Sequence, residues 1–263
     1  MARALLETLR RHGVPQAYGF LNGAKLQAHP EDRAVLEAWV AAGQPLGNHT
    51  WAHGDLSRLP AAEFNASIDA NEPLLRALQP QAPERTWRWF RYPFLHEGLE
   101  LPVRDAVRAH LARRGYRIAQ VTIDPYDWAY NVPYARCLLA GDTLRQEALR
   151  KAFLAEARAK LRWSVSQAQA VLGRPMRHVL LLHLGLLDAD TLEQLLADYE
   201  RLGVRWVTLE HAHEDPAYAQ NPNVTYGGMF LFQLAEARGV LPPPRPLSPD
   251  ALHETTCPEQ PLP

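Results

Sequence analysis

Two histidines four residues apart are the first side chains in this sequence that suggest chemistry. His49 and His53 follow an apolar run, in the segment 47–54. If residues 49–53 form a helical turn, both imidazoles lie on one face, with their Cβ atoms roughly 5–6 Å apart. Nitrogens placed in this way can share one zinc ion at about 2.0–2.1 Å each. The alternative interpretation is a pair of ordinary turn residues, so the metal hypothesis needs support from elsewhere in the chain.

That support comes from the ends of three other apolar runs. Arg91 ends an aromatic and basic segment, Asp124 and Asp127 follow a second run, and His183 ends a run of leucines. In α/β barrels the working residues sit at the carboxyl ends of the strands. Packing can account for one charged or imidazole side chain at a strand end. Four strand ends with such side chains are hard to explain by packing, and together they favour a functional site.

Each of these residues has a functional and a structural interpretation. An imidazole at position 183 suits a general acid, because its reference pKa is near neutrality, and Asp127 could orient it. His183 could equally be a core histidine bonded to a backbone carbonyl. Arg91 could reach inward to a carboxylate or form a surface salt bridge. Trp128 could wall a pocket or fill the core, and Asp124 with Asp127 could cap a turn.

The elements that would position these residues alternate along the chain. Helices are expected over 1–12, 31–42, 63–78, 103–114, 143–172 and 191–201, and strands over 17–21, 46–50, 87–94, 116–123, 178–183 and 204–209. Such alternation predicts an α/β fold with a parallel sheet or barrel. From residue 214 the chain reads as irregular and rich in proline. We therefore divide it into a barrel over 1–213 and an extension over 214–263.

Composition limits the classes of partner. The 263 residues are 47% hydrophobic with a formal net charge of −1, which provides a sizeable core but no basic footprint for nucleic acid. No apolar stretch reaches the roughly 20 residues of a membrane span. The first residues form an amphipathic helix with Glu7 where a signal peptide would be apolar. Cys137 and Cys257 could form one disulfide or remain as two free thiols.

In order, these segments resemble the polysaccharide deacetylases of carbohydrate esterase family 4. The segment 49–53 resembles the family's H-[ST]-x-x-H metal motif, and 91–94 its R-x-P-[YF] motif. The segment 124–128 resembles D-x-x-D-W, and 180–183 resembles L-x-L-H. The resemblance covers residues 14–210.

The resemblance implies a distorted (β/α) barrel, here of about seven strands with the first strand missing. It also implies metal-dependent hydrolysis of N- or O-acetyl groups on an acetylated polysaccharide or oligosaccharide, with release of acetate. Its implied site residues are the metal ligands His49 and His53, the catalytic acid His183, Asp127 that tunes it, Arg91 that orients the base, and the pocket residues Trp128, Leu181 and Tyr92. Zinc is the expected metal, and full-length members are expected in the periplasm or outside the cell.

One family motif has no counterpart in the sequence. The T-F-D-D-like segment supplies the base and the third metal ligand, and no Asp-Asp pair occurs in this chain. We expect the chain to be truncated before that motif and inactive or impaired. The strand at 17–21 would then lie at an open edge. The alternatives are a catalytically dead carbohydrate-binding barrel, with Trp51, Trp87, Trp89 and Trp128 lining a sugar groove, and a zinc amidohydrolase-like barrel of unrelated substrate.

Overall fold

Four short parallel strands form the main sheet, in the order β1-β2-β3-β5. They are β1 (Gly19–Leu21), β2 (Leu46–Asn48), β3 (Trp89–Phe90) and β5 (Arg117–Ile118). In this computed structural model, residues 2–244, 246 and 257 are described. The described residues divide into two units: unit 1 comprises those within 2–14, 122–206 and 242–257, and unit 2 comprises 15–121 and 207–241.

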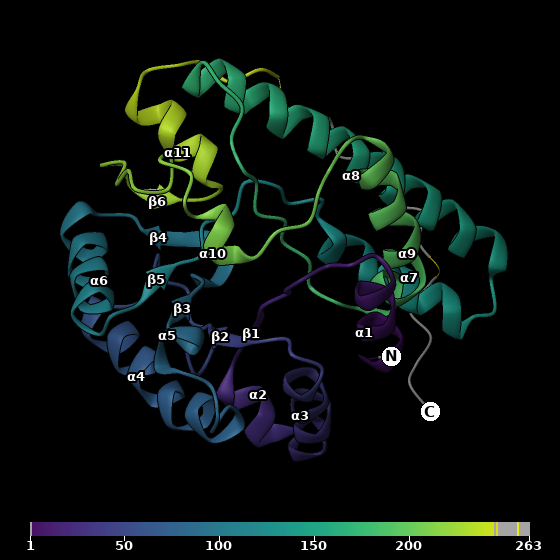
Figure 1. Cartoon of the computed structure of the whole chain (residues 1–263), viewed down its shortest axis with the longest axis horizontal. Coiled ribbons are helices and arrows are strands. Elements are labelled where there is room, and N and C mark those ends of the chain that lie inside the picture. Colours follow the sequence, from purple (N-terminus) through teal and green to yellow (C-terminus); the bar gives the residue numbers. More distant parts are fainter. Residues whose placement is uncertain (1, 245, 247–256, 258–263) are drawn as a thin grey trace. The chain divides into compact units, whose positions relative to one another are not determined.

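Unit 2 holds the sheet and the helices that connect its strands (Figure 1). These helices are α2 (Gly23–Ala28), α3 (Arg33–Ala41), α4 (Ala61–Leu78), α5 (Glu84–Trp87) and α6 (Leu101–Arg113). Helix α4 buries Phe64, Ile68 and Leu75 completely. At Gly47 in β2 a Cβ atom would lie 2.9 Å from the carbonyl oxygen of Trp89, so the strands approach closely only because this residue is glycine.

The remainder of unit 2 contains a second, smaller sheet. Strands β4 (His96–Gly98) and β6 (Tyr226–Gly227) pair antiparallel, and the helices α10 (Leu209–Ala212) and α11 (Phe230–Ala237) lie on either side of β6 in sequence. Two 3₁₀ turns, η1 (Pro30–Asp32) and η2 (Pro93–Leu95), complete the unit. The region after residue 214, expected to be irregular, therefore contains a strand and a helix.

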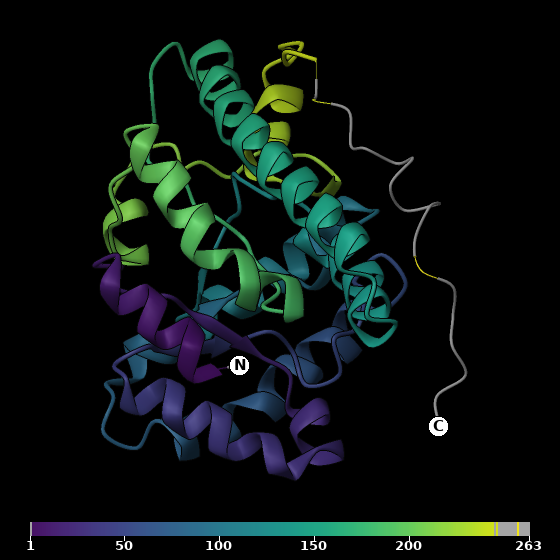
Figure 2. The ribbon, with the colours of Figure 1, turned by 90° about the vertical axis from the view of Figure 1, so that its right-hand side faces the viewer.

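Unit 1 is mainly helical. It contains α1 (Ala2–Arg11), α7 (Asp127–Leu139), α8 (Thr143–Leu172) and α9 (Leu186–Arg201), and α8 runs alongside α9 (Figures 1 and 2). Asp142 caps the start of α8 by accepting a hydrogen bond from the amide of Arg145 at 2.9 Å. Cys137 of α7 is joined to Cys257 by a disulfide, so the two cysteines are not free thiols.

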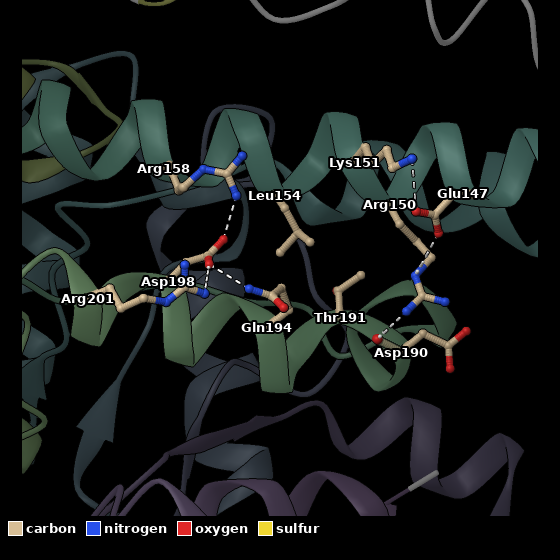
Figure 3. A pocket seen from close by; sticks show the side chains of 10 residues that line it. All are labelled: Glu147, Arg150, Lys151, Leu154, Arg158, Asp190, Thr191, Gln194, Asp198 and Arg201. Atoms are coloured by element: carbon tan, nitrogen blue, oxygen red, sulfur yellow. Dashed lines mark hydrogen bonds and ion pairs between the residues drawn. The ribbon is translucent and has the colours of Figure 1, made fainter.

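An ion pair and a hydrogen bond connect α8 and α9 across a groove of about 450 Å³ (Figure 3). Asp198, only 3% exposed, accepts hydrogen bonds from Arg158 of α8 and Arg201 of α9, each at 2.5 Å. At the other end of the groove, Arg150 donates to the carbonyl oxygen of Asp190 at 3.2 Å. The charges of this groove thus hold the two helices together.

Two expected strands are absent from the described residues. The run 178–183 contributes a single parallel bridge, between Leu180 and Ile123, and no ladder. The hydroxyl of Thr122 accepts a hydrogen bond from the amide of Val179 at 2.8 Å, where a ladder would use a backbone carbonyl. The expected strand at 204–209 is wrong as well, because Thr208 caps α10 by accepting a hydrogen bond from the amide of His211.

The α/β class and the parallel sheet are confirmed, whereas a closed barrel of about seven strands and the division at residue 213 stay predictions. As expected, β1 is an edge strand of the described sheet. Among the described helices, none combines the length and apolar character that a membrane span requires.

Candidate active site

The two histidines lie in a loop after β2, not in the helical turn that their spacing suggested. Thr50 and His53 both have positive φ angles, 64° and 54°, which a helix excludes. The loop still brings the imidazoles of His49 and His53 together, with ring centroids 4.8 Å apart and planes at 71°. The two imidazoles are therefore close together, as predicted, but a loop with positive φ angles brings them together and not a helical turn.

A hydrogen bond determines the role of Nδ1 in the ring of His49. Its Nδ1 lies 2.7 Å from the carbonyl oxygen of Arg91, and since a carbonyl only accepts, Nδ1 carries the proton. The lone pair of neutral His49 is then on Nε2, in the arrangement common for metal-binding histidines. His53 packs edge-to-face on Phe94 at 4.7 Å, which restrains its ring.

These two imidazoles fit two positions of a zinc site, but the described residues do not complete it. They contain no group of three or more His, Cys, Asp or Glu side chains placed to hold a metal ion. A zinc site in a hydrolase ordinarily has three protein ligands. Zinc binding by His49 and His53 therefore stays a prediction.

Arg91 and Tyr92 are both buried in unit 2. The Nε of Arg91 donates to the carbonyl oxygen of Ala119 at 3.0 Å, and its guanidinium lies 4.5 Å from the centroid of the Phe20 ring. Arg91 is 6% exposed and so faces inward, as expected, onto a carbonyl and a ring in these contacts. Tyr92 is 3% exposed and its ring packs 4.9 Å from that of Phe90, so its contacts are with core aromatics. Its role in a pocket stays a prediction.

His183 and Asp127 form a direct pair in unit 1. Asp127 is the first residue of α7 and is fully buried, and its Oδ1 lies 2.8 Å from Nδ1 of His183. Its Oδ2 accepts a hydrogen bond from the backbone amide of His183. The carboxylate of Asp127 thus fixes both the imidazole ring and the backbone of His183. The other ring nitrogen, Nε2, belongs to a side chain that is 43% exposed.

The electrostatics of this pair favour the imidazolium form. Burial acts to lower the pKa of His183, but the hydrogen bond and charge of Asp127, with the charges of Asp124 and Asp188, outweigh it and raise the pKa above its ordinary value. Burial, together with the negative charge of Asp127, raises the pKa of Asp188 itself to about 6. A raised pKa increases the fraction of His183 that is protonated near neutrality and so able to donate a proton.

The sequence interpretation did not identify Asp188 or Asn131, which support this pair. Asp188 is 1% exposed, and its Oδ2 accepts hydrogen bonds from the amide of Gly185 at 2.7 Å and from Asn131 at 3.0 Å. Asn131 also accepts from the amide of Leu187. The available signal was an aspartate three residues after a glycine at a helix start, a capping pattern that does not by itself indicate a site.

The remaining predicted residues of unit 1 lie close to this pair in sequence and differ in exposure. Trp128 is 53% exposed, in contact with Tyr126 at 5.9 Å between ring centroids. Leu181 is half-buried, and its amide donates to the carbonyl oxygen of Ile123 at 2.9 Å. Their assignment to an acetate pocket stays a prediction. The structure thus brings together His49 with His53 in unit 2, and His183 with Asp127 in unit 1.

Comparison with known proteins begins with a family model. Residues 1–119 match the model described as polysaccharide deacetylase. A chitooligosaccharide deacetylase from Bradyrhizobium sp. (strain ANU 289) is 31% identical over 125 residues, covering 48% of this chain and 51% of that relative. A peptidoglycan-N-acetylglucosamine deacetylase from Bacillus cereus is 27% identical over 124 residues, covering 47% and 40%. The chain thus spans about half the length of these curated relatives.

Solved structures share the fold at low identity. A CE4 family pseudoenzyme from Bacillus anthracis matches with a TM-score of 0.56 at 18% identity, covering 80% of this chain and 59% of that one. A family 4 carbohydrate esterase from Streptomyces lividans, in complex with acetate, matches with a TM-score of 0.51 at 17% identity, covering 80% and 88%. These neighbours imply a (β/α) barrel-like fold. The matched segment, the deacetylase relatives and the common fold together make this chain similar to the polysaccharide deacetylases of carbohydrate esterase family 4.

Proposed function

We propose that this protein is a metal-dependent polysaccharide or oligosaccharide deacetylase, which hydrolyses acetyl groups from a carbohydrate and releases acetate. The observation that carries the proposal is the preformed pair of His183 and Asp127. A buried carboxylate holds the imidazole by two hydrogen bonds and favours its protonated form. That arrangement suits a general acid that protonates the departing sugar nitrogen or oxygen, a role typically worth about 10²–10⁴ in rate.

Zinc is the metal we propose, with His49 and His53 as its ligands in this chain. When bound, such an ion polarises the acetyl carbonyl and lowers the pKa of water. The residues of the loop after β2 are prepared for this role, because the hydrogen bond from His49 to the carbonyl of Arg91 orients its ring, and Phe94 restrains His53. We assign Arg91 a positioning role and Trp128, Leu181 and Tyr92 the walls of the acetate pocket.

We further propose that hydrolysis by this chain is impaired. The sequence has no Asp-Asp pair, so the family's usual base and third ligand are missing from it. Two histidines without an anionic ligand bind zinc more weakly than a complete site. Water activated by zinc would then lack the carboxylate that the Asp-Asp segment of the family provides as a proton acceptor. The Bacillus anthracis neighbour, described as a pseudoenzyme, has a mutant described as having restored enzymatic activity.

The alternative, a catalytically dead carbohydrate-binding barrel, has less support than the sequence suggested. Trp87 and Trp89 are 1% and 0% exposed, so they belong to the core and do not line a sugar groove. Trp128, at 53% exposed, is available for stacking on a sugar. One exposed tryptophan is consistent with contact to a carbohydrate. A deacetylase also needs such contact, so Trp128 does not favour the binding barrel over the enzyme.

Chemical rescue tests both parts of the proposal. We would supply chitin oligomers carrying isotope-labelled acetyl groups, with zinc and with or without formate as a substitute carboxylate. We expect labelled acetate at a rate close to background without formate, a measurable increase with it, and a loss of about 10²-fold or more of that increase in His183→Ala. His29→Ala, at an exposed histidine, is the matched control.

The outcomes separate the two parts. Rapid release without formate overturns the impairment but supports the deacetylase. Release that is independent of His183, or no release from any acetylated chitin or xylan oligomer under rescue, overturns the proposed function.

A further inference from the structure

Helix α8 carries a row of polar side chains on a buried face. The residues are Glu156, Lys160, Ser164 and Gln167, all 5% exposed or less. Their spacing of three or four residues places them on one side of the helix. Each has at least one buried polar atom without a hydrogen-bond partner among the described residues. Buried charges are costly unless they are compensated, so packing alone does not explain a lysine here.

The surroundings of Lys160 show what compensates it. Its Nζ lies 3.6 Å from Oε1 of Glu156, and 4.4 Å from the centroid of the Tyr126 ring. Glu156 is itself held by the hydroxyl of Tyr130, which donates to its other oxygen at 2.6 Å. Burial lowers the pKa of Lys160, while the charges of Glu156 and Asp124 oppose that shift. The ammonium thus lies between α8 and the turn at residues 124–126.

That turn has an unusual backbone at the residue that contacts the lysine. Tyr126 has φ 59° and ψ 34°, the left-handed conformation that a side chain of its size rarely adopts. Its amide donates to Oδ1 of Asp124 at 2.9 Å. The next residue is Asp127, whose carboxylate holds His183. A small change at Tyr126 therefore displaces the group that orients the imidazole.

We propose that Lys160 is a positioning residue, which holds the ring of Tyr126 by a cation–π contact and so keeps Asp127 aligned on His183. The contact is desolvated, which strengthens an interaction of this type. Glu156 keeps the ammonium in place from its own helix, and Asp124 attracts it from the turn. The consequence for catalysis rests on the proposed role of His183 as general acid, but the alignment itself does not.

The pKa of His183, measured by NMR titration of its imidazole, tests the proposal. A purely electrostatic effect of Lys160 and a positioning effect predict changes of opposite sign in this pKa when the lysine is replaced. If Lys160 acts only through its charge, Lys160→Met removes a cation and raises the pKa of His183. If Lys160 positions the turn, the contact between His183 and Asp127 loosens and the pKa falls by about one unit. The other charges that face His183 are Asp124 and Asp188, and both remain in this variant.

Two further variants keep the test decisive if Lys160→Met fails to fold. The double variant Lys160→Met/Glu156→Gln also removes the carboxylate that Lys160→Met alone would leave buried without its cation. The amide oxygen of the introduced glutamine would still accept the hydrogen bond from Tyr130, as the carboxylate of Glu156 does. Tyr126→Leu removes the ring and keeps every charge, and Tyr126→Phe is its control, because the phenyl ring still accepts the cation. We expect a lowered pKa of His183 in the first two and an unchanged pKa in Tyr126→Phe.

A pKa of His183 that is unchanged or raised in Tyr126→Leu, or in whichever of the two Lys160 variants folds, overturns the proposal, and so does a pKa lowered equally in Tyr126→Phe. Acetate release is a separate measurement. If the pKa shifts as expected while formate rescue produces no acetate, the positioning role stands and the proposed deacetylase activity fails.

Discussion

The loop at 49–53 and the pair at 127 and 183 present histidines in contrasting ways. His183 has a buried carboxylate on its Nδ1 and is favoured as imidazolium. His49 has a backbone carbonyl on its Nδ1, which accepts the hydrogen of that nitrogen. We propose that His183 gives up a proton in the reaction and that His49 binds the metal. The same side chain is therefore directed to two chemistries by the group behind it.

The two regions also differ in how complete they are. Unit 1 contains His183, Asp127 and Asp188, and hydrogen bonds among described residues hold all three. The loop of unit 2 has two imidazoles and no carboxylate grouped with them among the described residues. The proposed general acid and its carboxylate are thus paired within the described part of unit 1, whereas the described residues of unit 2 provide two of the proposed metal ligands. Separate perturbation of the two regions tests this contrast.

The largest effect we expect is on unit 1, from removal of its disulfide. Cys137 and Cys257 are 120 residues apart, and a cross-link closing a loop of that length stabilises by up to about 5 kcal/mol in the chain-entropy model. Cys257→Ser should lower the free energy of unfolding measured in urea by a large part of that amount. Zinc affinity should be unchanged, because the histidines lie in the other unit.

The double variant Cys137→Ser/Cys257→Ser controls for the free thiol that Cys257→Ser leaves at Cys137. Its free energy of unfolding should equal that of the single variant. Equal stability of the oxidised and reduced wild-type protein would contradict the expectation. A loss of zinc binding on reduction would show that the proposed metal site depends on unit 1.

A smaller effect is expected for the proposed metal site. His49→Ala removes one of the two proposed nitrogen ligands and should weaken zinc binding by roughly 100-fold, or about 2.7 kcal/mol, in calorimetric titration. His183→Ala should leave zinc affinity within about twofold of wild type, because the tautomer and contacts of His49 do not involve it. If both variants weaken zinc binding equally, the proposed assignment of the metal to the loop after β2 is wrong.

Sequence patterns predicted well those elements whose ends are defined by local chemistry. The helix expected at 143–172 has the bounds of α8, because Asp142 caps its start and Gly173 adopts the left-handed conformation at its end. Helix α7 was missed, since Pro133 stands within it and proline normally indicates a break. The bond between Cys137 and Cys257 was one of two alternatives, because sequence spacing does not show which distant residues meet.

The candidate site was predicted in its residue types but not in its support. The motif around Asp127 and His183 identified a pair that the structure confirms as a contact. The carboxyl of Asp188 and the ammonium of Lys160 come from α9 and α8, where they resemble ordinary helix residues in the sequence. Their importance depends on burial, which a linear pattern does not report. The positive φ angles at Thr50, His53 and Tyr126 were likewise invisible, because none is glycine.

The smallest effect we expect separates the two histidine environments by pH. Asp127→Asn keeps the shape of the side chain but removes its charge, so the pKa of His183 should fall by about one unit in NMR titration, with zinc affinity unchanged.

The raised pKa of His183 contributes stability that is fully present below about pH 6.5, the unfolded value, and is lost as pH rises through the folded value. The pKa of Asp188, raised to about 6, acts in the same direction, since its contribution is lost as pH rises from about 3.8 through 6.

The difference in free energy of unfolding between wild type and Asp127→Asn should therefore be larger at pH 5 than at pH 8. Asp55→Asn is a useful comparison in unit 2, because hydrogen bonds from Ser57 and His96 outweigh burial and lower the pKa of Asp55. That contribution is present above the unfolded pKa and is lost as pH falls through the folded value, so the penalty of Asp55→Asn should be larger at pH 8 than at pH 3. A penalty for Asp127→Asn that grows with pH would mean that Asp127 does not stabilise the imidazolium, and it would remove the distinction between a proton-donating and a metal-binding histidine.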